Sequence, residues 1–175
     1  GSSDLIINWF GNLRSIGLVE FDLSAVPAGA TVNSATLDLY HSTNSSQNTQ
    51  YDLFRVTSPW VENTVTFNTA PTFDPIAVAS LIIPDSSAGV HRLWDVTSIV
   101  SDWVNGTFSN YGFWIEEIPI QGTGIAYFSS SDVGTAAFRP RLTIDATING
   151  RVPEPATLAL FGLGLAGLGF ARRKN

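Results

Sequence analysis

Short apolar segments separated by turn-forming residues recur along the first 147 residues of the chain. The clearest of them alternates, because Ala35, Leu37 and Leu39 are separated by Thr36 and Asp38. An alternation of period two is typical of a strand that buries one face. We expect strands at residues 5–10, 16–23, 35–39, 51–56, 76–83, 91–96, 111–116, 125–129 and 142–145. Eight or nine strands in so short a chain favour an all-β fold, a two-layer antiparallel β-sandwich of jelly-roll type.

One segment departs from this alternation. Between Asp95 and Gly106 the apolar side chains recur at helical spacing and share one face: Ile99, Val100, Trp103 and Val104. Asp95 or Thr97 is suited to cap the start of a helix here, and Gly106 to follow its end. The pattern predicts one short amphipathic helix that closes an end of the sandwich.

The end of the chain has a third pattern. Residues 156–171 contain no charged side chain, and Arg172, Arg173 and Lys174 follow them. As a helix this run would be about 24 Å long, slightly short of the ~30 Å hydrocarbon core of a bilayer. A core helix can have the same length, but it is seldom apolar on every face with a basic cluster at its end. We therefore expect residues 156–175 to form a hydrophobic membrane helix whose basic end stays in the cytoplasm.

Charge divides the chain at the same place. The whole chain carries a net charge of −6, and residues 1–150 hold five arginines against fourteen carboxylates. The small basic excess lies in residues 151–175. Because an acidic domain repels phosphate, nucleic acid is not expected as a partner.

The composition offers little support for catalysis. Cys is absent and His41 and His91 are the only histidines, so one chain cannot supply a three-histidine zinc site. Glu116 and Glu117 are neighbours on an expected strand, where adjacent side chains point to opposite faces and cannot flank one glycosidic bond. We predict no enzymatic activity and no cofactor. A polysaccharide-active enzyme is the least favoured alternative, since carboxylates on separate strands could still meet in the fold. A structural calcium ion is compatible with the many Asp and Asn oxygens, although no coordinating loop is present.

A short motif precedes the apolar run: Val152, Pro153, Glu154 and Pro155. Pro-Glu-Pro, a single hydrophobic segment and a basic end resemble the PEP-CTERM sorting signal of exported bacterial proteins. The resemblance implies processing near this motif by an exosortase, a membrane-embedded transpeptidase. It further implies transient anchoring in the inner membrane, followed by release to the cell surface or extracellular matrix. Because the sequence opens on Gly1, we expect a signal peptide and the first residues of the domain to precede it.

A second resemblance rests on an ordered series of motifs within residues 1–147. These are RSIGLVEFDLS at residues 14–24, PAGATVNSATLDLY at 27–40, WVENTVTFN at 60–68, WDVT at 94–97 and FRPRL at 138–142. The series is similar to the DNRLRE domain, a β-sandwich module of secreted bacterial proteins. That family overlaps carbohydrate-binding modules attached to polysaccharide-degrading enzymes. Phe67 stands where we expect Trp in the family.

These patterns predict three parts: a β-sandwich over 1–147, a linker over 148–155 and the sorting helix over 156–175. Two functions fit the sandwich, association with an extracellular polysaccharide or a structural, adhesive role without a ligand site. Trp60, Trp94 and Trp114 are candidates for stacking on sugar rings, and each has core packing as its alternative. An exposed row of aromatic side chains would favour the first function. Arg139 and Arg141 are expected to pair with acidic side chains on a neighbouring strand.

Overall fold

The computed structural model describes residues 2–10, 13–43, 48–85, 87–118 and 125–148. The Pro-Glu-Pro motif, the predicted membrane helix and its basic end lie outside the described residues. Within the described part, no helix is long and apolar enough to cross a membrane.

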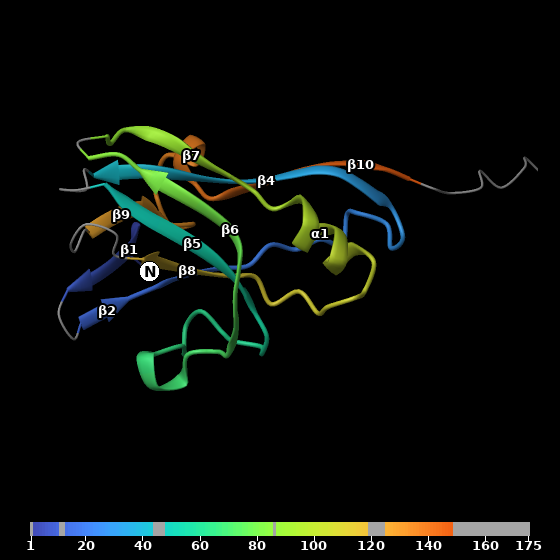
Figure 1. Cartoon of the computed structure of the whole chain (residues 1–175), viewed down its shortest axis with the longest axis horizontal. Coiled ribbons are helices and arrows are strands. Elements are labelled where there is room, and N and C mark those ends of the chain that lie inside the picture. Colours follow the sequence, from blue (N-terminus) through green and yellow to red (C-terminus); the bar gives the residue numbers. More distant parts are fainter. Residues whose placement is uncertain (1, 11–12, 44–47, 86, 119–124, 149–175) are drawn as a thin grey trace, which may run out of the picture.

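The strands form two antiparallel sheets, which Figure 1 shows as the layers of the domain. Sheet A contains β1 (Asp4–Phe10), β2 (Leu13–Ser15), β4 (Thr31–Thr43), β7 (Val90–Asp95), β9 (Ile125–Ser129) and β10 (Arg141–Thr147). Sheet B contains β3 (Gly17–Val19), β5 (Thr49–Val56), β6 (Phe73–Ile83) and β8 (Phe113–Ile118). The predicted all-β sandwich is confirmed.

The strand pairs are nested within one another. The innermost pair is β5 with β6, followed outward by β4 with β7, β3 with β8 and β1 with β9. Successive nested pairs belong alternately to sheet B and sheet A, which is the path of a chain that wraps both sheets as a jelly roll. β10 and β9 both pair with β4, at different positions along its length.

One predicted strand is much shorter in the structure than expected. Residues 16–23 were expected to form one strand, but β2 ends at Ser15 in sheet A and β3 covers only Gly17–Val19 in sheet B. The chain crosses between the layers at Gly17, where an added Cβ would lie 3.1 Å from the Ile7 side chain of the opposite sheet. The prediction of a strand over the whole of 16–23 was wrong, because Phe21 and Leu23 pack against the core from the irregular chain that follows β3.

The inner faces of the sheets build the main core. Ala35, Leu37 and Leu39 of β4 are buried, as the alternation predicts. Asp38 is also buried, although it belongs to the outward set, because His91 and Arg141 bind its carboxylate. A second, smaller apolar cluster lies on the outer face of sheet B, around Phe54 and Trp114.

The predicted helix is α1 (Thr97–Val104), at the end of the sandwich where β10 leads out of the domain (Figure 1). Its buried side chains are those expected from the sequence: Ile99, Val100, Trp103 and Val104. The predicted cap needs correction, because Val96 occupies the N-cap position. Asp95 acts one residue earlier and accepts the backbone N–H of Thr97 at 3.0 Å. Gly106 follows the helix with a φ of 73°, as its position predicts.

Candidate functional site

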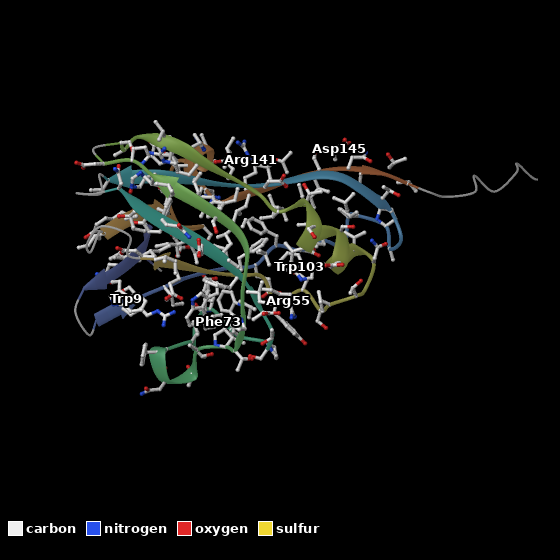
Figure 2. The ribbon with its side chains drawn as sticks, viewed as in Figure 1. Trp9, Arg55, Phe73, Trp103, Arg141 and Asp145 are labelled. Atoms are coloured by element: carbon white, nitrogen blue, oxygen red, sulfur yellow. The ribbon has the colours of Figure 1, made fainter. Side chains whose placement is uncertain are left out.

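The outer face of sheet B carries a cleft of about 530 Å³. One wall is the chain between Thr57 and Thr72, here called the covering segment, which includes the 3₁₀ turn η1 (Phe67–Thr69). The opposite wall comes from β1 and β2. The lining residues are Leu5, Arg14, Ser15, Ile16, Leu18, Trp60, Glu62, Val65, Thr66, Phe67, Ala70, Phe73 and Trp114. In Figure 2, Phe73 lies above the covering segment and Trp9 lies toward the β1–β2 hairpin.

Three of the aromatic side chains that line this cleft, which we call the aromatic cleft, are Trp60, Phe67 and Trp114. Phe67 is 83% exposed, which is unusual for so large an apolar group. Trp60 is half-buried, and its indole N–H donates to the backbone carbonyl of Tyr111 at 2.9 Å. Trp114 is 7% exposed and stacks on Phe73 with ring centroids 4.4 Å apart. The cleft therefore has a packed aromatic floor and one free aromatic ring on its wall.

Local hydrogen bonds hold the covering segment in shape. Its two ends are joined by the backbone N–H of Thr57, which donates to the carbonyl of Thr72 at 2.8 Å. The backbone N–H of Thr66 donates to the hydroxyl of Thr69 at 2.8 Å, which closes the turn that carries Phe67. A ring held on a closed turn loses little conformational freedom when it contacts a ligand.

An ion pair fixes the opposite wall. The guanidinium of Arg14 binds the Glu116 carboxylate, and the indole N–H of Trp114 donates to the same oxygen at 3.1 Å. The guanidinium lies 5.3 Å from the ring centre of Trp9 and 5.7 Å from that of Trp114. Arg14 is thus held by one carboxylate and two aromatic rings before any ligand arrives.

A second depression of about 420 Å³ adjoins the aromatic cleft. The two share Leu5, Leu18, Trp60 and Glu62, so they lie side by side and the same side chains border both. The second depression adds Glu20, Ser130 and Ser131 to the lining. Burial raises the pKa of Glu20 above its ordinary value. We call this part the acidic depression.

The predicted ligand-binding tryptophans separate into two groups. Trp60 and Trp114, distant in sequence, both line the aromatic cleft. Trp94 does not: it is 1% exposed in the main core, and its indole N–H donates to the carbonyl of Tyr51 at 3.3 Å. Its burial leaves no ring face for a sugar, because β7 turns this position toward the inside of the sandwich.

Phe67 and Arg14 were not among the candidates drawn from the sequence. Phe67 is the one aromatic residue between Trp60 and Phe73, in a stretch of mainly polar residues, and such an isolated aromatic residue is the signal that could have identified it. Arg14 carried no comparable signal, since its role depends on Glu116 from a distant strand.

Glu116 and Glu117 point to opposite faces of β8, as predicted from the strand geometry. Glu116 faces outward to Arg14, whereas Glu117 is fully buried and accepts the backbone N–H of Trp9 at 2.9 Å. The pKa of the Tyr51 hydroxyl is raised by the burial of Tyr51 itself and by the negative charge of the nearby Glu117. The two carboxylates cannot act on one bond.

The predicted pairing of the 139–141 arginines holds for one of them. Arg141 binds Asp38 on the neighbouring strand at 2.5 Å, and His91 binds the second oxygen of the same carboxylate at 2.7 Å. Arg139 instead donates to the backbone carbonyl of Val133 at 3.1 Å. Across the residues that the structure describes, no three His, Asp or Glu side chains gather closely enough to hold a metal ion.

Comparison with known families agrees with both parts of the chain. The model of carbohydrate-binding module family 96 matches residues 2–146, and the PEP-CTERM protein-sorting motif matches residues 151–174. No curated protein matches the sequence. The first family is one of binding modules, not of catalytic domains, and the resemblance to the DNRLRE domain is compatible with it. The sorting motif indicates export, transient membrane anchoring and a final place at the cell surface or outside the cell. The chain therefore belongs to carbohydrate-binding module family 96 and carries a PEP-CTERM protein-sorting motif.

Proposed function

We propose that the sandwich is a non-catalytic module that attaches the exported protein to extracellular polysaccharide through the aromatic cleft. The observation that carries this proposal is Phe67, an 83% exposed ring at the edge of a cleft floored by Trp114. A monosaccharide ring has an apolar face of C–H groups that packs on such a ring, and nearby polar side chains bind its hydroxyl groups. Ser15, Thr66 and Glu62 supply those polar groups from the lining.

The energy available at Phe67 is suited to reversible attachment. Full burial of a Phe side chain contributes about 1.5–3 kcal/mol. Because Phe67 is almost completely exposed in the free protein, nearly all of this amount is available to a ligand. A tenfold change in affinity corresponds to about 1.4 kcal/mol.

The test removes the Phe67 ring from the whole chain, kept soluble in detergent, and measures retardation in gels that contain neutral, aminated or acidic polysaccharides. We expect Phe67→Ala to weaken binding about tenfold or more, with little change in stability. Ile76→Ala is the matched control, because Ile76 on β6 is 74% exposed and does not line the cleft. If no polysaccharide binds the unmodified chain, the module is a structural or adhesive surface domain without a glycan site. If both variants bind as tightly as the unmodified chain, the glycan binds elsewhere and the aromatic cleft is not its site.

The sorting steps are assigned to the C-terminal residues on their sequence alone. In this proposal the exosortase recognises Pro153, Glu154 and Pro155, and the basic residues Arg172, Arg173 and Lys174 hold the chain end in the cytoplasm. The mature protein then ends near Pro153, with residues 148–155 as the linker that precedes the sorting helix. Mass spectrometry of the protein from its host tests this, and an exported chain that still ends at Asn175 would contradict it. Replacement of the three motif residues by alanine should leave unprocessed protein in the membrane.

A further inference from the structure

The strand β6 forms one edge of sheet B. The strands of this sheet follow the order β3, β8, β5, β6, so β6 pairs with β5 on one side only. The register of this pair shifts near the start of β6, but it is regular from Ala79, opposite Leu53, to Ile83, opposite Thr49. Among the residues that the structure describes, no other backbone segment hydrogen-bonds to residues 79–83. We call residues 79–83 the open edge, because their free side presents unpaired N–H and C=O groups.

The open edge lacks the usual protection of an edge strand. Charged side chains, proline and bulges normally prevent such a strand from pairing with another chain. Pro75 and the shifts of register protect the first half of β6, whereas residues 79–83 contain neither a charge nor a proline. Ile82 is 57% exposed, and Leu81 packs against the main core but is only half-buried. Apolar surface is therefore uncovered beside the unpaired backbone.

The other edges of the two sheets are short or charged. β2 and β3 have three residues each. β7 and β10, which each pair with β4 alone, carry charged or titratable side chains: His91, Arg92 and Asp95 on β7, Arg141 and Asp145 on β10. Among the described strands, the open edge is thus the one stretch of edge that is regular, uncharged and longer than three residues.

We infer that the open edge binds a second copy of this chain, by antiparallel pairing of β6 with β6. Two identical strands match in this arrangement, because a two-fold axis perpendicular to the sheet places donors of each strand opposite acceptors of the other. With the axis at Leu81, this residue lies opposite its own counterpart, and Ser80 lies opposite Ile82 of the second copy. The two copies of sheet B then form one continuous sheet. This inference goes beyond the proposed function and does not depend on it.

Charge favours this edge as the place where two copies meet. Residues 1–150 hold fourteen carboxylates against five arginines, so two copies repel one another over most of their surfaces. The carboxylate of Asp74, toward the other end of β6, is bound by Arg55 at 2.9 Å. Asp52, opposite Ser80 on β5, is buried. Because each copy has one open edge and its other edges are short or charged, the pairing closes as a dimer and does not continue into a fibre.

Sedimentation of the whole chain over a range of concentrations, in density-matched detergent and without sugar, measures the dimer. Pairing over residues 79–83 makes a small interface, so we expect an equilibrium between monomer and dimer that depends on concentration. Ser80→Lys and Ile82→Lys should each raise the dissociation constant about tenfold or more, because a lysine on an edge strand opposes pairing with a second strand. Ser80→Lys changes an exposed polar residue and leaves the apolar packing of the domain intact. Val61→Lys is the matched control, because Val61 is 61% exposed on the covering segment, away from β6.

Cross-linking locates the contact. The chain has no cysteine, so Ser80→Cys and its control on β10, Thr143→Cys, each introduce a single thiol. A short bismaleimide should join two chains of the Ser80 variant and leave chains of the Thr143 variant separate.

Four outcomes would overturn the inference: a monomer at every concentration, a dimer that survives both lysine substitutions at Ser80 and Ile82, equal loss of the dimer in Val61→Lys, or equal cross-linking of the two cysteine variants. A dimer held together by the C-terminal residues would survive both lysine substitutions. Since no sugar is present, none of these results bears on the proposed function, which the Phe67→Ala variant tests separately.

Discussion

The outer face of each sheet carries a stacked aromatic pair and an ion pair, but different segments of the chain cover the two faces. On sheet A, Tyr40 stacks on Phe138 at 3.9 Å, and Asp38 binds Arg141 and His91. On sheet B, Phe73 stacks on Trp114 at 4.4 Å, and Glu116 binds Arg14. Each face thus joins an aromatic pair to an ion pair.

The difference lies in the chain that crosses each face. On sheet A the short turn η2 (Ala136–Phe138) brings Phe138 directly onto Tyr40, so that the aromatic surface is used within the protein. On sheet B the covering segment is longer, and it leaves a cleft in which Phe67 remains exposed. The stacked pair on sheet B therefore borders an open cleft, whereas the pair on sheet A is itself formed by the segment that crosses the face.

The largest effect should come from the floor of the cleft. We expect Trp114→Ala to lower the free energy of unfolding by about 3–5 kcal/mol. The substitution removes a large buried ring, its stacking contact with Phe73 and its hydrogen bond. Chemical denaturation followed by fluorescence or circular dichroism measures the change. Trp114→Phe keeps an aromatic ring against Phe73 and should lose clearly less. A loss below about 1 kcal/mol for the alanine variant would show that the outer face of sheet B is not a packed cluster.

A smaller effect should distinguish the two faces directly. We expect Phe138→Ala to cost about 1–2 kcal/mol of stability, since it removes a half-buried ring that stacks on Tyr40, and to leave polysaccharide binding unchanged. Phe67→Ala should have the reverse profile, with binding lost and stability kept. If Phe138→Ala also weakens binding, sheet A contributes to the site and the comparison fails.

The smallest expected effect is a dependence of the free energy of unfolding on pH, caused by His41 on the inner face of sheet A. Burial holds the pKa of His41 below its ordinary value of 6.5, with a further contribution from the nearby Arg92 charge. The unfolded chain therefore takes up a proton at this residue before the folded protein does. Stability should be fully present above pH 6.5 and should fall as the pH decreases toward the lower native pKa.

The slope from this one group is at most about 1.4 kcal/mol per pH unit. Denaturation at a series of pH values measures it, and His41→Gln should flatten the profile just below pH 6.5 even though the variant is less stable overall. An unchanged slope in the His41 variant would show that other groups cause the dependence.

Much of the fold was predictable because its signals are local. The alternation of Ala35, Leu37 and Leu39 identifies a strand, since a pleated chain points successive side chains to opposite faces. The same geometry correctly separated Glu116 from Glu117. The helical spacing that ends with Trp103 and Val104 predicted α1 and the side it buries. In each case the evidence lies within a few neighbouring residues.

The site depended on contacts between distant parts of the chain. Trp60, Trp94 and Trp114 are equivalent as residues in a sequence, yet only the first and third reach the cleft. Their difference follows from the order in which the strands pair and from the face that each position presents.

The sequence by itself therefore determined most of the strands, the helix, the acidic character of the domain and the sorting motif at its end. The tertiary structure alone decided that the chain crosses between sheets at Gly17, that Arg14 is neutralised by Glu116, and that Phe67 is left uncovered. The reason is physical: strand and helix formation depend on the chemistry of near neighbours, whereas the cover over an aromatic surface depends on which remote segment packs against it.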